Sequence, residues 1–498
     1  MALVLRGGLI MTPTRDDVRV GRGTIVVDGD RIARVEWDGG RPIEAVPGAH
    51  VIDAGDRIVI PGLVDAHAHF YGSLIPGLVD RLPLDMRMPY LGACLEGWEA
   101  RDHELATLLG AARMLRNGTT TVLENVLQGI GATEPVIRAL VQSGMRAVVG
   151  PMITDRAYHD VMPEFVSRLP ESLRRDVVGT TGAVMPPKEM VDVCRALAAR
   201  WHGAEGRISF CLSPAMPHRC SDGLLTLIAE AAAIDRLVVH TNLLETRAQA
   251  ALARRLWGHS MVEHLHALGL LREGFSGAHA VWLTDRDIDL MAESGAAISH
   301  NPLSNLYLGS GIARVPRLLE RGVAVGIGSD GPNCGSTTSL VEIMKLAAIV
   351  HRLGEADGRR WPSAADAFRM ATLGGARAVG LAHEVGSIEV GKKADLVLLD
   401  RAAPSLVPLN DPVMQLVYGE TGSAVRTVIV NGEIVVEDGH STRLDVRALL
   451  AEAAERGDRL AARIRPALAD VARLEPYLRQ AYLDLLAAFE AGERSSGG

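Results

Sequence analysis

The chain has 498 residues, of which 48% are apolar, 22% charged and 4% aromatic, and its formal net charge is −8. This length and composition predict a globular protein of several domains with a large buried core. The acidic balance and the scattered lysines and arginines argue against a nucleic acid or an anionic membrane as partner, and they favour a small-molecule substrate.

The first residues lack the basic start and long apolar core of a signal peptide, and no apolar stretch is long enough to span a bilayer. The five cysteines are scattered along the chain: Cys94, Cys194, Cys211, Cys220 and Cys334. Such spacing is typical of reduced thiols rather than of a disulfide framework. We therefore expect a cytoplasmic protein.

The two ends of the chain share a β-rich texture. Residues 1–60 contain short apolar runs separated by turn signals such as DGD at 28–30, and the same pattern returns at 394–400 and 425–436. The sequence therefore predicts one composite β-sandwich domain, built from residues 1–60 and 385–443.

The middle of the chain alternates apolar β-type runs with helical patterns such as those at 104–116 and 222–234. The expected strands are 58–67, 119–123, 145–150, 208–213, 237–242, 278–283, 296–300 and 323–329. Eight buried strands that alternate with helices favour a (β/α)₈ barrel over residues 61–384. An open doubly wound sheet is the alternative, although no glycine-rich nucleotide loop follows the first strand.

Residues 444–498 are rich in Ala, Leu, Arg and Glu and have helical periodicity without a strand signal. We expect a helical tail that packs on the barrel or on a partner subunit.

The segment 61–69, PGLVDAHAH, places two histidines one residue apart at the end of the first barrel strand. Side chains at positions i and i+2 of a strand share a face, so His67 and His69 would point to one place. Two converging imidazoles suit a borderline transition metal.

Metal-type or acid/base residues also mark the other strand ends, where a (β/α)₈ barrel carries its chemistry. The fifth strand runs through His240 to Glu245, and the sixth begins near His279. The seventh ends at His300 and the eighth at Asp330. Five strand ends supplying such residues favour one shared site over accident.

These motifs resemble the amidohydrolase superfamily, in the branch of atrazine chlorohydrolase and the cytosine, guanine and methylthioadenosine deaminases. The resemblance covers nearly all of residues 1–440. Its motifs are PGLVDAHAH at 61–69, HNPLSN at 300–305, GSDG at 328–331 and GSIEVGKKADL at 386–396.

The resemblance implies a mononuclear hydrolytic site with one divalent transition metal ion, with zinc first and iron, cobalt or manganese as alternatives. His67, His69 and Asp330 would bind the ion, and Asp330 would also accept a proton from the attacking water. His279 would contact the water or the developing oxyanion, and Glu245 would carry protons to the substrate and the leaving group.

One position departs from the family pattern. Where relatives place a third histidine ligand, this chain has Asn242. Asn242 can bind the metal through its amide oxygen, which would give a harder site. Alternatively His240, on the same strand face, replaces it or leaves a water in that coordination place. In a third interpretation the site has lost its metal and its activity.

The sequence signals for substrate contacts are less specific than those for the metal site. Ala215 stands where nucleoside-deaminating relatives place a histidine, which counts against methylthioadenosine or S-adenosylhomocysteine as substrate. The candidate substrate contacts are His218, Trp98, His300, Ser304 and Asn305.

The resulting hypothesis is a metal-dependent hydrolase that acts on a non-peptide C–N bond of a small, heteroaromatic compound, by metal-activated water, as a deaminase does. The alternatives are an amide, urea or carbamate hydrolase, a triazine-type dechlorinase, and a metal-poor binding protein without catalysis. We expect a small-molecule substrate, no nucleic-acid or membrane partner, and a homodimer or higher homo-oligomer.

Overall fold

Eight parallel strands close into a barrel at the centre of the computed structural model, which describes residues 2–38, 47–174, 185–335 and 337–496. The barrel strands are β6 (Leu63–Ala68), β7 (Thr119–Val126), β8 (Arg146–Ile153), β9 (Ile208–Pro214), β10 (Val238–Leu243), β11 (Phe275–His279), β12 (Ala297–His300) and β13 (Ala324–Ile327). The predicted (β/α)₈ barrel is confirmed.

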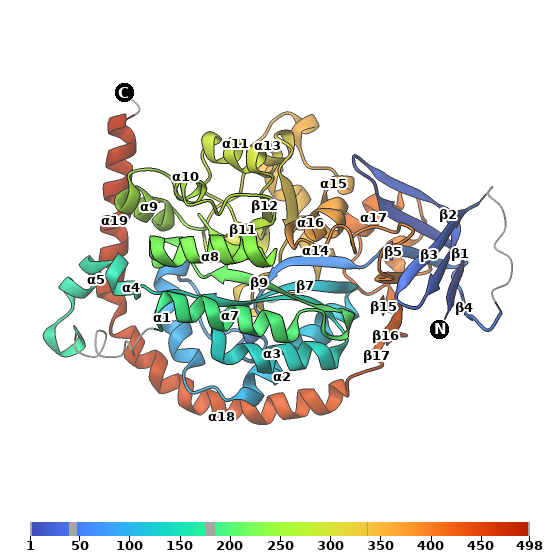
Figure 1. The fold of residues 1–498 in the computed structure, drawn as a ribbon, viewed down its shortest axis with the longest axis horizontal. Coiled ribbons are helices and arrows are strands. Elements are labelled where there is room, and N and C mark those ends of the chain that lie inside the picture. Colours follow the sequence, from blue (N-terminus) through green and yellow to red (C-terminus); the bar gives the residue numbers. More distant parts are fainter. Residues whose placement is uncertain (1, 39–46, 175–184, 336, 497–498) are drawn as a thin grey trace.

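Helices surround the barrel (Figure 1). They are α1 (Leu84–Leu95), α2 (Ala100–Arg116), α3 (Ile130–Ser143), α4 (Tyr158–Val161), α5 (Pro163–Arg168), α7 (Pro187–Trp201), α8 (Asp222–Asp235), α9 (Arg247–Trp257), α10 (Met261–Ala267), α11 (Asp285–Ser294), α12 (Pro302–Tyr307), α13 (Val315–Glu320), α14 (Leu340–Ile349), α15 (Ala364–Arg369), α16 (Gly375–Ala378) and α17 (Pro412–Tyr418). Local signals set their ends. For example, α8 begins where the Ser221 hydroxyl accepts a hydrogen bond from the Leu224 amide, at 3.1 Å.

A second sheet of nine strands joins the two ends of the chain, as expected (Figure 1). Its strands are β1 (Leu3–Pro13), β2 (Val18–Asp28), β3 (Arg31–Trp37), β4 (His50–Asp53), β5 (Arg57–Pro61), β14 (Leu396–Asp400), β15 (Val425–Val430), β16 (Glu433–Glu437) and β17 (His440–Ser441). The strands run in the order β17-β16-β15-β14-β5-β1-β2-β3, and β4 pairs with β1. The exact domain bounds, 1–60 with 385–443, stay predictions.

The apolar run that begins at Ile58 is two strands, which corrects the single strand expected over 58–67. β5 ends at Pro61 and pairs with β14 in the second sheet, whereas β6 begins at Leu63 in the barrel. Gly62 lies between them, and a Cβ there would come within 2.0 Å of the Thr120 hydroxyl. The chain therefore changes sheets at a glycine, where a neighbouring strand comes too close for a side chain.

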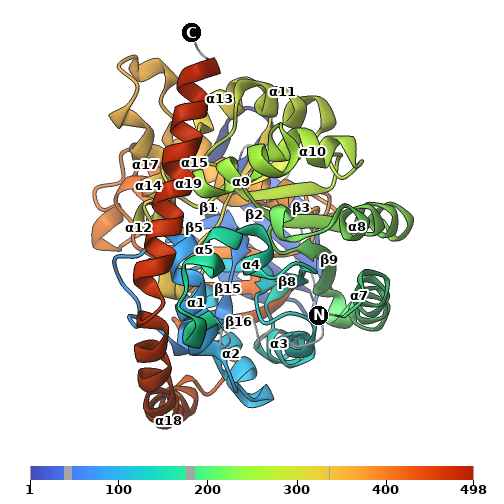
Figure 2. The same ribbon diagram turned by 90° about the vertical axis from the view of Figure 1, so that its left-hand side faces the viewer.

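The tail forms two long helices, α18 (Val446–Ala472) and α19 (Glu475–Ser496), which pack on the barrel. α18 contacts α1 and α2, and α19 contacts α1, α5 and α9. Figure 2 shows α19 crossing the barrel end that faces the viewer, beside α1, α5 and α9. In the described part of the chain, no helix is long and apolar enough to cross a membrane.

Candidate metal centre

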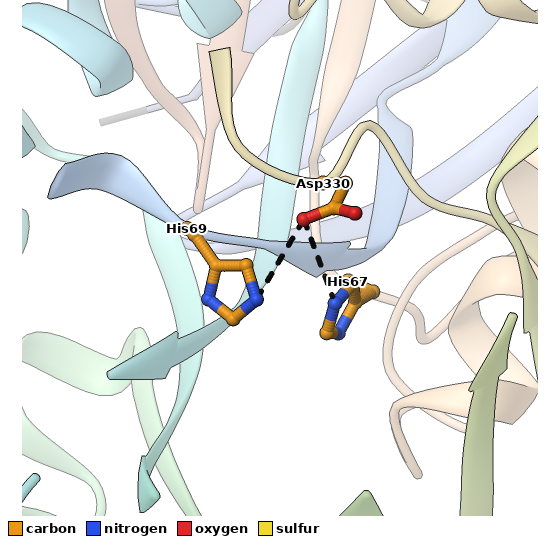
Figure 3. A group of neighbouring side chains, drawn as sticks. All are labelled: His67, His69 and Asp330. Atoms are coloured by element: carbon orange, nitrogen blue, oxygen red, sulfur yellow. Dashed lines mark ion pairs between the residues drawn. The ribbon is translucent and has the colours of Figure 1, made fainter. Parts of the chain in front are cut away.

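His67 and His69 lie at the end of β6 and point to the same place, as the alternation of a strand requires (Figure 3). The His69 Nδ1–H donates to the backbone oxygen of Asn125 at 2.6 Å, so the Nε2 lone pair is left for another partner. His67 has the same arrangement, because its Nδ1 lies 2.8 Å from the Nε2 of His240. Outer hydrogen bonds of this kind fix the tautomer of metal-binding histidines.

Asp330 brings a carboxylate to these two imidazoles. It follows β13 and pairs with Ala68 across an isolated parallel bridge. Its Oδ1 lies 3.6 Å from the Nε2 of His69 and 3.9 Å from the Nε2 of His67. Two imidazole nitrogens and one carboxylate oxygen thus converge on a single volume, which Figure 3 shows between the three side chains.

The other carboxylate oxygen of Asp330 faces a second pair of residues. Asp330 Oδ2 lies 4.0 Å from the Nε2 of His279, and that nitrogen lies 3.5 Å from the Oε2 of Glu245. His279 ends β11, which corrects the sequence expectation that the sixth strand begins near it. The apolar residues after His279 extend the β-type pattern past the end of the strand.

The backbone is strained at three of these strand ends. Leu244, His279 and Asp330 have positive φ angles of 45°, 69° and 60°, which side chains with a Cβ rarely adopt. Strain of this kind persists where surrounding contacts enforce it, and it concentrates at functional sites. Here it turns His279 and Asp330 inward at the carboxyl end of the barrel.

Asparagines orient the His279 ring. The Nδ1–H donates to the amide oxygen of Asn305 at 2.9 Å, and the Asn301 amide nitrogen lies 3.4 Å from the same Nδ1. The opposite nitrogen, Nε2, is buried without a hydrogen-bond partner and faces Glu245 and Asp330. The asparagines therefore fix the His279 ring through Nδ1, and Nε2 points toward the carboxylates of Glu245 and Asp330.

Asn242 and His240 lie on the same face of β10 but have different surroundings. The His240 Nε2 is engaged with His67, and the His240 Nδ1 and the Asn242 Oδ1 are both buried without a hydrogen-bond partner. An orphaned amide oxygen costs free energy unless something binds it. Because the His240 Nε2 accepts the bond from His67, the proton of His240 is on Nδ1, and Asn242 is the better candidate for a ligand.

The burial of these groups shifts their pKa values in the directions that metal binding requires. Burial, reinforced by the neighbouring imidazoles, lowers the pKa of His67, and burial lowers the pKa of His69. Neutral imidazoles can donate lone pairs to a cation. Burial, together with Asp330 and Asp85, raises the pKa of Glu245, so its carboxyl group retains a proton more readily than usual.

The donor set fits a divalent ion. The His67 Nε2 and the Asn242 Oδ1 are buried without partners, and Asp330 supplies a carboxylate beside His67 and His69. Two imidazoles with one carboxylate and further oxygen donors form a mixed N/O site, which suits zinc and related ions.

Sequence reasoning missed the residues that support the ligands. Asp65 Oδ1 accepts from the backbone amides of His67 at 3.2 Å and Ser329 at 3.0 Å, and so ties the first and eighth strands together. At Gly328 a Cβ would meet the Cβ of His67 at 2.9 Å, so only glycine allows this approach. Asp65 shares the strand face of His67 and His69, which was the available signal.

The remaining predicted contacts are spread around the site. Ser304 and Asn305 lie buried on α12, and His300 is buried with its ring centroid 5.3 Å from that of His351. His218 is also buried, and burial lowers its pKa to about 3. Trp98 packs in the apolar cluster that α1 forms with α18, and its indole N–H donates to the Cys94 oxygen at 2.9 Å. Their role as substrate contacts stays a prediction.

Comparison with known proteins gives concordant matches. Residues 58–435 match the amidohydrolase family. A 5-methylthioadenosine/S-adenosylhomocysteine deaminase of Moorella thermoacetica is 34% identical over 88% of this chain and 95% of its own length. A 5'-deoxyadenosine deaminase of Methanosarcina mazei is 31% identical over 93% of this chain and 99% of its own. The crystal structure of an adenosine deaminase from Xanthomonas campestris with bound zinc matches with a TM-score of 0.82 and 28% identity, over 92% of this chain and 98% of that one.

Proposed function

Because the chain belongs to the amidohydrolase family and is therefore a metal-dependent hydrolase of non-peptide C–N bonds, we propose that it deaminates an amino-substituted heteroaromatic ring of the adenosine type. The support for this substrate class is that the two relatives are named as deaminases of adenosine derivatives and align over most of both chains. In the proposed reaction, water adds to the ring carbon that carries the amine, and ammonia leaves.

One observation carries the proposal. The carboxylate of Asp330 lies between the two histidines of β6 and the His279–Glu245 pair, with one oxygen toward each group. A single residue thus connects the metal-type donors with the acid/base residues. This is the juxtaposition that hydrolysis by an activated water requires.

The proposed roles follow from the positions of the side chains. His67, His69 and Asp330 would hold the ion, with the amide oxygen of Asn242 as a further ligand, and we propose zinc as that ion. When bound, a divalent ion supplies Lewis acidity that favours deprotonation of water. Asp330 Oδ2, which faces His279 rather than His67 and His69, accepts the proton that the attacking water gives up.

Glu245 and His279 act on the substrate side. Glu245 lies beside His279 and Asp330, buried from solvent, and holds a proton for the leaving nitrogen. His279, whose proton is held on Nδ1 by Asn305, presents the lone pair of its Nε2 to the attacking water beside Glu245 and Asp330. Protonation of the amine by Glu245 and collapse of the tetrahedral carbon release ammonia and leave a ring carbonyl.

Ammonia release by the purified protein tests the reaction. The substrates are adenosine, 5'-deoxyadenosine, methylthioadenosine and S-adenosylhomocysteine, with aminated pyrimidines and triazines, amides and ureas in parallel. We expect ammonia from an adenine-bearing compound. Activity confined to amides or ureas would contradict the proposed substrate class. Less than about a tenth of an equivalent of bound metal, without rescue by zinc, iron, cobalt or manganese ions, would contradict the metal-dependent mechanism.

The Asn242→His variant tests the ligand set. An imidazole is a better ligand for zinc than an amide oxygen, so the variant should bind zinc more tightly and discriminate more strongly against manganese. Metal affinities are measured by competition with a chelator. An unchanged metal profile would show that residue 242 does not touch the ion.

The Ala215→His variant addresses the nucleoside. The sequence prediction is that the missing histidine disfavours methylthioadenosine and S-adenosylhomocysteine. Accordingly, A215H should raise kcat/KM for these two nucleosides relative to a free aminated base. Equal changes for nucleoside and base would contradict that prediction.

A further inference from the structure

Helix α1 lies across the carboxyl end of the barrel. Leu84 and Met88, one turn apart on α1, pack against Met216, Leu308 and Cys334. These three residues follow β9, β12 and β13, so α1 connects the loops after the fourth, seventh and eighth barrel strands. Helix α1 therefore covers the carboxyl-end opening of the barrel, the mouth, next to β9, β12 and β13.

A buried arginine fastens the same face of α1. Arg87 donates to the backbone oxygen of Asn333 at 2.7 Å and to that of Val79 at 2.9 Å. Its guanidinium also lies 5.7 Å from the ring centroid of Tyr307. Asn333 follows β13 and lies three residues after Asp330, so this bond ties α1 to the loop that carries a proposed ligand.

The opposite face of α1 packs against the C-terminal tail, the helices α18 and α19. Met86 belongs to an apolar cluster with Leu478 and Ala481 of α19, and the Tyr90 hydroxyl donates to the Glu475 carboxylate at 2.7 Å. Further along α1, a second apolar cluster contains these side chains of α1 and α18: Leu91, Cys94, Leu460 and Ile464. Figure 2 shows α19 running beside α1.

The tail is itself anchored beside the barrel. Arg456 of α18 donates to the buried Asp102 of α2 at 2.8 Å, and Arg101 of α2 pairs with Glu452 of α18 at 2.6 Å. α19 packs in the same cluster as Leu252 of α9, the helix that follows Glu245. The tail therefore runs from α2, which contacts α18, to α9, which contacts α19.

The sequence of α1 makes it dependent on these contacts. Pro89 lies in the interior of the helix, where it removes a backbone hydrogen bond, and no side-chain hydrogen bond caps the first turn. A helix with these defects has little stability of its own, so its tertiary contacts must hold it in place.

The site beneath α1 is closed. Glu245 and His279 are each 1% exposed and Asp330 is 5% exposed, so almost none of their surface is open to solvent in this conformation. We infer that α1 is a lid over the barrel mouth and that the C-terminal tail, α18 and α19, is the brace that keeps it shut. Release of α1 from the tail then admits substrate. The inference concerns access alone, and it holds whichever C–N bond is cleaved.

Thiol labelling tests the lid without reference to activity. Cys334 lies under α1 in the mouth cluster, whereas Cys211 lies inside the barrel on β9 and is fully buried. The rate at which iodoacetamide modifies each cysteine is followed by peptide mass spectrometry. Cys334 reports opening of the lid, and Cys211 reports loosening of the whole barrel.

The first variant ends at residue 474 and lacks α19. We expect Cys334 to be labelled about tenfold faster than in the full chain, because the apolar contacts of Met86 are lost, while Cys211 stays unlabelled on the same timescale. An unchanged Cys334 rate would overturn the inference. So would a parallel rise at both cysteines, since that would make the tail a general stabiliser.

A point variant keeps the test valid if the shortened chain fails to fold. Tyr90→Phe removes only the hydrogen bond to Glu475, and we expect it to speed Cys334 labelling about threefold with Cys211 unchanged. The matched control is Arg459→Gln, which removes the exposed pair of Arg459 with Glu455, both on α18. Equal labelling of Cys334 in Y90F and R459Q would overturn the inference.

Discussion

A buried polar cluster lies at each end of the barrel, and the Arg146–Asp395 cluster of the amino end is more completely hydrogen-bonded than the cluster of the carboxyl end. At the amino end, Arg146 and Asp395 form an ion pair through two hydrogen bonds, at 2.8 and 3.0 Å. The backbone N–H of Asn431 also donates to Asp395, and Arg146 also donates to the backbone oxygen of Gly206. At the carboxyl end, buried atoms of His67, Asn242, Glu245 and His279 have no hydrogen-bond partner. The amino end joins the barrel to the second sheet, whereas the carboxyl end keeps donors and acceptors available to a ligand.

The amino-end cluster should therefore contribute to stability, and the carboxyl-end cluster to catalysis. A fully satisfied buried network stabilises one structure, and a partly satisfied one costs free energy that a ligand can recover. The comparison therefore predicts that substitutions at the two ends affect different quantities. Four substitutions test it, in order of decreasing expected effect.

Asp330→Asn should abolish most activity and leave the fold intact. The amide cannot accept a proton from water and is a poorer ligand than a carboxylate, so kcat/KM should fall about a thousandfold or more. No arginine or lysine pairs with Asp330 among the described residues, so the free energy of unfolding should not fall. Ammonia release and urea unfolding measure the two quantities. A large loss of stability would break the distinction between the two ends.

Asp395→Ala should have the opposite profile. It leaves the buried Arg146 guanidinium without its counter-charge, and the free energy of unfolding should fall by about 3–5 kcal/mol. The fraction that remains folded should retain its kcat. The control is Asp235→Asn, which removes the exposed ion pair with Arg195 and should leave the unfolding curve unchanged. Equal curves for the two variants would contradict the role of the amino-end cluster.

His240→Leu should weaken metal binding without removing a ligand. His240 accepts the hydrogen bond that fixes the His67 tautomer, and loss of such an outer partner lowers metal affinity about 10- to 100-fold. Chelator competition measures the affinity, and His440→Leu, at an exposed position on β17, is the control. Complete loss of metal would instead favour His240 as a direct ligand.

Asn305→Ala should produce the smallest of these effects. It removes the oxygen that orients His279, and kcat should fall about tenfold, the equivalent of one hydrogen bond. KM should change little, because His279 faces the reacting carbon and not the bulk of the substrate. Asn305→Asp retains an acceptor and should restore part of kcat. If N305D were as slow as N305A, the orienting bond would not be the cause.

The sequence predicted the barrel because its signals are local. Eight apolar runs alternate with helical patterns, and histidines follow several of them at a spacing that a strand converts directly into direction. The strand boundary at His279 was misplaced, because the residues after it are apolar while their backbone has already turned to positive φ. Hydrophobic pattern does not report such a turn.

The supporting interactions were not predictable in the same way. Asp65 bonds to Ser329, and His69 bonds to the backbone of Asn125, so each role depends on contacts between distant parts of the chain. A helical tail was expected, but its contact with α1 depends on how the two pack. Single-sequence patterns identify what a residue can do, and the fold determines which partner it meets.

The pairing of β5 with β14 also has a consequence for biosynthesis. Arg57 of β5 lies opposite Asp400 of β14, so nearly the whole barrel is translated between the two partners. At ribosomal rates this delay amounts to tens of seconds, during which the apolar strands near the N-terminus have an unpaired edge. We therefore expect that edge to need protection, for example by chaperones, until β14 has been made. Rapid overexpression should then cause incomplete chains to aggregate.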